Sequence, residues 1–324
     1  MKEEQSIKLD KKDKQIMRQL EENSRQSYTE IGKKVGLSNE TIEYRIKKML
    51  DNGLIIRMFA EPNLPRLGLK TYRIYLKTAK LTKEDEESIL HYFATNPKAQ
   101  WYAEFEGEWD YTLRLAVENE TQLKEEMDRL MTKFGKFILA KDIVMTQYQT
   151  YLPISHFTES ERKLRTIAIG KEKTIRIDEI DLKLLFHLFE NARTKTVDLA
   201  VKVNLSPDAV QYRIKKLMEE GAIAFFTAWF DRRKFGYEYY KVLLWFQYAT
   251  PEDERKLIAY CEQHPNIVFV NRVLGNWDLE LDFDAKNSAE IHELVKEVKN
   301  RFPDMIRNHT TLAILKDGVP NPFG

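Results

Sequence analysis

The chain has 324 residues, of which 43% are hydrophobic and 32% are charged, and its formal net charge is +1. This balance is typical of a globular protein of about two domains and excludes a disordered chain. The single cysteine excludes an internal disulfide and a cysteine-rich zinc site, and the lack of a long apolar run or signal peptide predicts a cytoplasmic protein without a membrane partner.

The first elements predicted along the chain are three helices and a strand. Residues 10–21 and 29–35 carry apolar side chains at helical spacing, and Gly36 suits the end of the second helix. Ser38 suits the start of a third helix that runs to about residue 52. Two short helices joined by a tight turn after another helix predict a helix-turn-helix, and the strand and turn that follow predict its wing.

The third helix has an apolar and a polar side at 100° per residue. Its apolar side carries four residues: Ile42, Ile46, Met49 and Leu50. Its N-cap, polar side and flanks supply the candidate DNA contacts: Ser38, Thr41, Tyr44, Arg45, Lys47 and Lys48. An exposed tyrosine beside cations suits a major groove, because cations reach phosphates and guanine edges. A solvated helix face without a ligand is the alternative interpretation.

From residue 70 onward the hydrophobic pattern alternates between strand and helix periods. We expect strands over 71–78, 99–107, 110–118 and 138–148 and helices over 83–96 and 121–134. The order β-α-β-β-α-β predicts a ferredoxin-like domain.

The whole arrangement occurs twice, with an offset of 168 residues and no gap. The letters YRIKK fill 44–48 and 212–216, and GEWD at 107–110 matches GNWD at 275–278. The chain is therefore predicted to be a tandem duplication of α+β units. The third helix of the second repeat supplies six more candidate DNA contacts: Ser206, Gln211, Tyr212, Arg213, Lys215 and Lys216.

The duplication predicts five segments along the chain. They are a winged helix-turn-helix in 1–62, a ferredoxin-like domain in 63–155, a linker in 156–174, a second winged helix-turn-helix in 175–230 and a second ferredoxin-like domain in 231–324. The sequence leaves open whether the repeats pair with each other or with repeats of another chain.

The two repeats differ at positions expected to face DNA. Thr41 of the first repeat corresponds to Ala209 of the second, which lacks a hydroxyl group. Lys33 corresponds to Val201, which lacks a charge. These differences predict that the first repeat is the stronger DNA reader.

A winged helix-turn-helix followed by this βαββαβ domain resembles the leucine-responsive/asparagine regulator (Lrp/AsnC) family of bacterial and archaeal transcription factors. The resemblance rests on LDKKDKQIMRQLEENSR at 9–25, IGKKVGLSNETIEYRIKKMLDNGLI at 31–55, the hinge glycine Gly68 and the G-x-W-D turns. It implies a sequence-specific regulator that binds double-stranded DNA. Most members are single units, whereas this chain is a fused pair.

The resemblance further implies that the ferredoxin-like domains mediate self-association and bind an amino-acid-like effector. The implied effector residues lie near the turn between the second and third strands of each domain: Gly107, Trp109, Asp110, Gly275, Trp277 and Asp278. A tight turn with a purely structural tryptophan is the alternative interpretation of these residues.

No catalytic motif accompanies this architecture. The six histidines show no metal-ligand spacing, and neither a Gly-rich phosphate loop nor a G-x-S-x-G motif is present, so we expect no enzyme, metal or cofactor. Siroheme decarboxylases resemble the same two-domain architecture and provide the alternative function. An amino-acid-binding module without DNA binding is a third hypothesis.

Overall fold

The computed structural model describes residues 7–154, 157, 163–169 and 173–323, and the chain divides into two compact units. One unit comprises 1–63, 153–163 and 175–237, and the other comprises 64–152, 164–174 and 238–324. Each unit thus combines the equivalent domains of both repeats, so the repeats pair within one chain. The segment boundaries predicted for each repeat stay predictions, because the compact units group the segments differently.

The first unit contains the two predicted helix-turn-helix domains, each followed by one strand. The elements are α1 Lys11–Glu22, α2 Tyr28–Val35, α3 Asn39–Asp51 and β1 Ile55–Pro62, then α6 Glu179–Glu190, α7 Thr196–Val203, α8 Pro207–Glu219, β7 Ile223–Phe230 and the short 3-10 helix η3 Arg232–Phe235. Local signals explain these bounds. Ser27 caps α2, and Gly36 ends it at a positive φ of 72°, which favours glycine.

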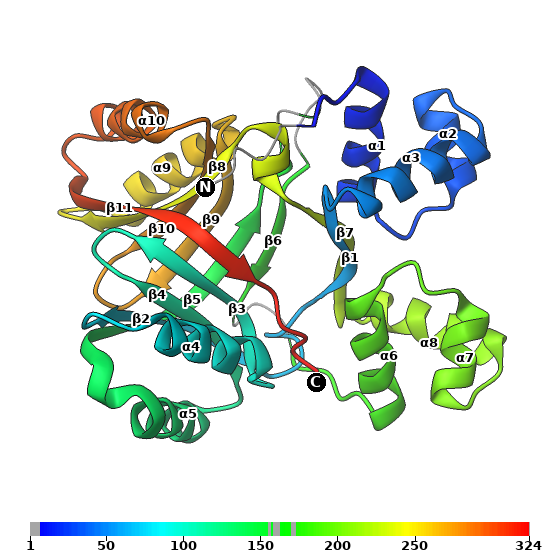
Figure 1. Cartoon of the computed structure of the whole chain (residues 1–324), viewed down its shortest axis with the longest axis horizontal. Coiled ribbons are helices and arrows are strands. Elements are labelled where there is room, and N and C mark those ends of the chain that lie inside the picture. The colour runs from blue at the N-terminus through cyan, green and yellow to red at the C-terminus, as the bar shows by residue number, and fades with distance from the viewer. Residues whose placement is uncertain (1–6, 155–156, 158–162, 170–172, 324) are drawn as a thin grey trace. The chain divides into compact units, whose positions relative to one another are not determined.

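The strands that follow the two helical groups pair with each other (Figure 1). β1 and β7 run antiparallel, with Met58 opposite Ala228. The helix α1 of the first repeat packs on β7 of the second, and α6 packs on β1. Each strand predicted as part of a separate wing therefore belongs to a ribbon that both repeats share.

The second unit contains the two predicted βαββαβ domains, and the expected order of elements is confirmed. The elements are β2 Lys70–Thr78, α4 Lys83–Thr95, β3 Ala99–Glu106, β4 Tyr111–Val117, α5 Glu120–Phe134, η1 Gly135–Phe137 and β5 Ile138–Tyr151, then β8 Glu238–Phe246, α9 Pro251–Gln263, β9 Ile267–Leu274, β10 Leu279–Ala285, α10 Ser288–Arg301 and β11 Ile306–Gly318.

The strands of this unit form one nine-stranded sheet in the order β2-β4-β3-β11-β8-β10-β9-β5-β6. Because β2 also pairs with β5, all strands except β6 close into an antiparallel ring. The strand β6, Arg165–Ala168, pairs antiparallel with β5 and lies inside the segment 156–174 that was expected to be a linker. Other parts of that segment, residues 156, 158–162 and 170–172, lie outside the described residues.

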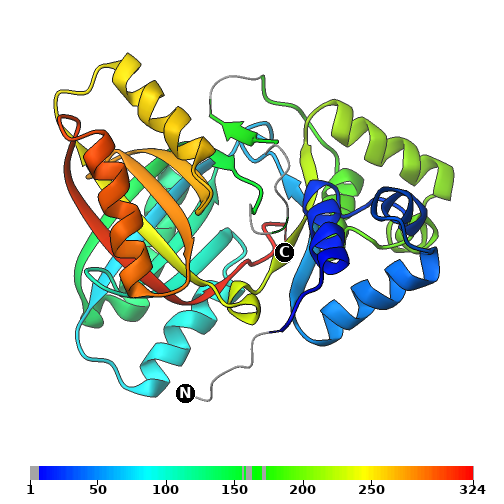
Figure 2. The same ribbon diagram turned by 90° about the horizontal axis from the view of Figure 1, so that it is seen from above.

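Successive side chains along each strand lie alternately on the outer and the inner face of the ring. Apolar residues such as Ile74 and Leu281 belong to two cores, one of which includes Phe93 of α4 and the other Leu257 of α9. In Figure 2 the gold α9 and the orange α10 lie outside the strands. The intervening side chains point into the ring, as the period of two requires. This inner set includes five buried charged residues: Arg73, Lys241, Glu280, Asp282 and Asp284.

Candidate nucleic-acid interface

The third helices α3 and α8 present the same exposed side chains in both repeats. Tyr44 is 67% exposed and Tyr212 is 69% exposed, although aromatic side chains usually lie inside. Four lysines and one glutamine of the candidate set are also exposed: Lys47, Lys48, Lys215, Lys216 and Gln211. An exposed tyrosine beside exposed lysines suits a helix that contacts phosphates and base edges.

The candidate serines form the N-caps of these helices. The Ser38 hydroxyl accepts a hydrogen bond from the Thr41 amide at 3.3 Å, and Ser206 accepts one from the Ala209 amide at 3.2 Å. The Thr41 hydroxyl lies 3.1 Å from the Ser38 hydroxyl and keeps capacity for a further hydrogen bond. The serines therefore set where the two helices begin.

The two arginines of the YRIKK motif pair inside their own domains. Arg45 donates to Asp10 and Asp13 at 2.7 Å each, which ties α3 to the N-terminus of α1. The hydrogen bond from Arg45 holds the pKa of Asp10 below its usual range. Arg213 makes the equivalent pairs with its own two aspartates at 2.8 Å each. These pairs support a positioning role for both arginines, and the phosphate contacts expected from the sequence stay a prediction.

The lysines of the two helices differ in their partners. In α8, Lys215 lies 3.6 Å from Glu219 and Lys216 lies 3.8 Å from Glu220. Within the described parts of the chain, Lys47 and Lys48 of α3 make no ion pair, and the residue four positions after Lys48 is an asparagine. The cations of α3 are therefore the more available ones.

Two reciprocal arginines join the two helix-turn-helix domains. Arg25 donates to the carbonyl groups of Ala192 and Thr194, the latter at 3.1 Å. Arg193 donates to the carbonyl groups of Ser24 and Gln26, both at 2.8 Å. Each arginine thus binds the turn of the other repeat, and with the β1–β7 ribbon these bonds hold the two domains as a pseudo-symmetric pair.

The G-x-W-D turns lie where the ferredoxin-like domains meet. A Cβ atom on Gly107 would come within 2.8 Å of Leu312 on β11, and one on Gly275 would collide with Val144 on β5. Both glycines allow the turn of one repeat to press against the last strand of the other. The second turn also places the ring of Trp277 4.8 Å from that of Tyr75.

The other turn residues are buried or hold neighbouring strands. Trp109 and Trp277 are 6% and 1% exposed, and their rings lie 6.4 Å apart. Asp110 accepts hydrogen bonds from the amide and hydroxyl of Thr78, and Asp278 accepts one from the Phe246 amide. These contacts support the structural interpretation of the turns, whereas effector binding stays a prediction.

Comparison with known proteins identifies the family. Residues 9–50 match the AsnC-type helix-turn-helix domain, and residues 177–224 match a winged helix-turn-helix DNA-binding domain. An uncharacterised HTH-type transcriptional regulator of Pyrococcus horikoshii is 32% identical over 120 residues, which is 37% of this chain and 80% of the relative. The regulatory protein AsnC of Haemophilus influenzae is 26% identical over 146 residues, 44% of this chain and 94% of that protein.

The chain belongs to the Lrp/AsnC family of transcriptional regulators. The predicted function, a DNA-binding transcriptional regulator, is confirmed at the level of this family. Among solved structures, the siroheme decarboxylase NirDL in complex with an iron-uroporphyrin III analogue is similar to this Lrp/AsnC chain, with a TM-score of 0.65 and 12% identity. That likeness covers 97% of this chain and 95% of the decarboxylase, and it concerns the duplicated fold alone.

Sequence reasoning missed two functional groupings of this Lrp/AsnC protein. The pairing of Arg45 and Arg213 with aspartates could have been predicted, because the two aspartates and the arginine of each repeat recur at the offset of 168 residues. The partners of Arg25 and Arg193 are backbone carbonyl groups, which no side-chain pattern reveals. One expected apolar contact also differs, since Leu50 near the end of α3 is 39% exposed.

In the part of the chain that the structure describes, no helix is long and apolar enough to cross a membrane.

Proposed function

We propose that this protein is a sequence-specific DNA-binding regulator in which α3 and α8 read one operator as an unequal pair. The observation that carries the proposal is the reciprocal bonding of Arg25 and Arg193, which holds both DNA-facing domains in one unit. Exposed Tyr44 and Tyr212 then belong to one pseudo-symmetric reader. Such a pair suits a DNA site with two half-sites.

We assign the side chains of the interface to two roles. Lys47, Lys48, Lys215 and Lys216 contact phosphates, and Tyr44, Tyr212, Thr41 and Gln211 approach base edges. Ser38, Ser206, Arg45 and Arg213 position the helices, as their hydrogen bonds within the domain indicate. Phosphate contacts supply affinity without sequence information, and base contacts supply preference.

The proposal is tested by footprinting and fluorescence anisotropy on the promoter of the protein's own gene at two salt concentrations. We expect a protected site and an affinity that falls steeply with salt, because each phosphate contact adds about 0.9 to the log–log slope. Binding with no protected site, or an affinity that salt does not change, contradicts the proposal.

We further propose that an amino-acid-like effector modulates DNA binding through the ferredoxin-like unit. Trp109 and Trp277 would report it, because their rings lie 6.4 Å apart across the two repeats. An effector that changes DNA affinity must itself bind with an affinity that DNA changes, since linkage is reciprocal. Tryptophan fluorescence and DNA affinity should therefore shift together across a panel of amino acids, and a panel without any response counts against this effector class.

A second candidate function is tetrapyrrole chemistry of the siroheme decarboxylase type. It is favoured by the likeness to NirDL, which spans both repeats at a TM-score of 0.65. Titration with iron-uroporphyrin III separates the candidates, because a tetrapyrrole site perturbs the absorption bands of the ligand and a DNA reader leaves them unchanged.

A further inference from the structure

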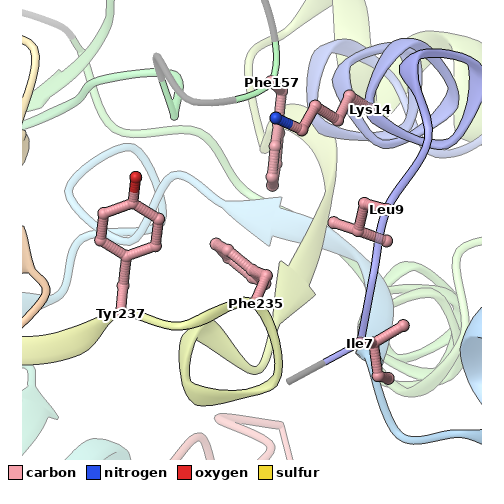
Figure 3. Close-up of a pocket in the computed structure, with 6 residues that line it drawn as sticks. All are labelled: Ile7, Leu9, Lys14, Phe157, Phe235 and Tyr237. Carbon is pink, nitrogen blue, oxygen red and sulfur yellow. The ribbon is translucent and has the colours of Figure 1, made fainter.

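A cavity of about 210 Å³ lies in the DNA-binding unit, apart from the candidate DNA contacts (Figure 3). Its lining comes from three separate parts of the chain: Ile7, Leu9, Lys14, Phe157, Phe235 and Tyr237. The amide of Ile7 donates to the carbonyl of Lys234 at 2.6 Å, which fastens the segment before α1 to η3. The backbone thus holds two walls of the cavity in place.

The aromatic wall of the cavity is supported by neighbouring rings. Phe157 is buried and packs edge-on against Phe230, with ring centroids 5.2 Å apart. Phe235 lies 5.6 Å from Phe157 and 5.9 Å from Tyr237. Figure 3 shows these rings on one side and the aliphatic Ile7 and Leu9 on the other. The walls therefore suit an apolar, ring-shaped ligand.

The size of the cavity limits the ligand to one ring with a short tail. An engineered cavity of about 150 Å³ lined by aliphatic and aromatic side chains binds benzene in another protein. The present volume of about 210 Å³ leaves room for a few more atoms.

The charged side chain of the lining indicates which polar group the ligand carries. Among the described residues that line the cavity, Lys14 is the only cation and none carries a carboxylate. Among the described residues, Lys14 has no ion-pair partner. Lys14 is exposed, so its ammonium can pair with a ligand carboxylate at the mouth of the cavity, whereas no described acidic side chain of the lining can pair with the ammonium of an amino acid. The lining thus favours a plain carboxylate over an amino acid.

The duplication provides an internal comparison for these residues. At the offset of 168, Lys14 corresponds to Leu182, Phe235 to Leu67 and Tyr237 to Leu69. Since the other repeat folds in the same way without them, Lys14, Phe235 and Tyr237 are not required by the fold that the repeats share. We propose that the cavity is a binding site for a small aromatic monocarboxylate, with Lys14 binding the carboxylate and the rings of Phe157, Phe235 and Tyr237 holding the apolar part.

The test is calorimetric titration of the full chain with phenylpropionate, phenylpropanol and phenylalanine. We expect phenylpropionate to bind about three- to fivefold more tightly than the neutral alcohol or the amino acid, because an ion pair with an exposed lysine contributes at most about 1 kcal/mol. Replacing Lys14 by Met should remove that advantage over the alcohol. Lys11→Met is the matched control, because Lys11 is an exposed lysine of α1 outside the cavity lining, and it should leave binding unchanged.

A second variant tests the aromatic wall. Phe235→Leu introduces the residue found at the equivalent position of the first repeat, and it should weaken phenylpropionate binding several-fold while the melting temperature shows that the chain still folds. The proposal is overturned if wild type does not bind phenylpropionate at millimolar concentration. It is equally overturned if Lys14→Met binds the acid as tightly as wild type, or if phenylalanine binds as well as phenylpropionate.

Discussion

Arg73 on β2 forms a buried ion pair with Glu280 on β10, so a cation of one repeat meets an anion of the other inside the ring of strands. The side chains are 3% and 0% exposed. Tyr75 donates a further hydrogen bond to Glu280 at 2.8 Å, and Lys241 lies 3.5 Å from the same carboxylate. At the 168-residue offset Glu280 corresponds to Thr112, so two copies of the first repeat would lack this anion. The buried charges therefore disfavour pairing of two first repeats.

Removing one partner of this pair should destabilise the ferredoxin-like unit strongly. Arg73→Leu leaves a buried carboxylate with less compensation, and breaking a buried pair in this way costs about 3–5 kcal/mol. The double variant Arg73→Leu with Glu280→Leu should lose less than the sum of the single losses, which chemical denaturation measures. Lys124→Leu, which breaks an exposed pair with Asp128, is the control and should cost at most about 1 kcal/mol. Additive losses would contradict the coupling.

The same pair predicts how stability depends on pH. Burial alone raises the pKa of Glu280, but Arg73, Lys241 and the hydrogen bonds from Tyr75 and Trp277 lower it below its usual range. A lowered pKa in the folded state contributes stability that is present above the unfolded value of about 4.3 and is lost as the pH falls through the folded value. Denaturation from pH 7 to pH 3 should show this loss.

Glu280→Gln should lower stability at neutral pH and flatten its fall in acid, because the group no longer titrates. Glu125→Gln, a change at an exposed glutamate of α5, should leave the acid slope of the wild type intact. An identical acid slope in Glu280→Gln and wild type would show that this carboxylate does not drive the loss.

Arg45→Ala should affect folding more than DNA contacts. The variant loses the pairs with Asp10 and Asp13, which are partly exposed and contribute about 0.2–1 kcal/mol each. The melting temperature should therefore fall, while the salt slope of DNA binding stays near that of wild type. Lys47→Ala is the matched change on the same helix and should show the reverse pattern. A lower salt slope in Arg45→Ala would instead show that Arg45 contacts a phosphate.

The elements within each repeat could be predicted because their signals are local. Ser38 starts α3 through a hydrogen bond to a residue three positions away, and Gly36 ends α2 through its own backbone conformation. Leu50 shows where periodicity weakens, because it lies near the helix end and is 39% exposed despite its apolar phase.

The contacts between repeats could not be predicted in the same way. Arg73 and Glu280 are 207 residues apart, and no periodic pattern links residues at such a separation. The ribbon of β1 and β7 likewise depends on which repeat meets which, since each strand alone is compatible with a separate wing. The strand β6 was missed because a four-residue element carries too little alternation to stand out in a polar segment.

The two recognition helices should contribute unequally to DNA affinity. Lys48→Ala should weaken binding more than Lys216→Ala, because Lys216 already lies 3.8 Å from Glu220 and Lys48 has no such partner among the described residues. Fluorescence anisotropy at several salt concentrations measures both losses. Glu220→Asn introduces the residue that follows Lys48 at the same spacing, and it should raise affinity only while Lys216 is present. Equal losses for the two lysines would refute the inequality.

The best operator should consist of two dissimilar half-sites. The structure pairs the repeats within one chain, so we expect α3 and α8 to face the DNA together. Thr41 on α3 corresponds to Ala209 on α8. A symmetric operator mirrors a two-fold symmetric protein, with half-site centres about 34–36 Å apart for successive turns, but unequal readers do not require a palindrome. Selection of binding sites from random DNA should therefore yield a conserved half-site and a more variable one.

The operator experiment also assigns each half-site to a helix. Repeating the selection with Thr41→Ala should relax the conserved half-site, because the variant removes a hydroxyl that Ala209 already lacks. The Ala209→Thr variant is the reciprocal control and should sharpen the variable half-site. A perfect palindrome selected by the wild-type chain would mean that α3 of one chain meets α3 of another on DNA, and the intrachain pair would then not be the unit that reads the operator.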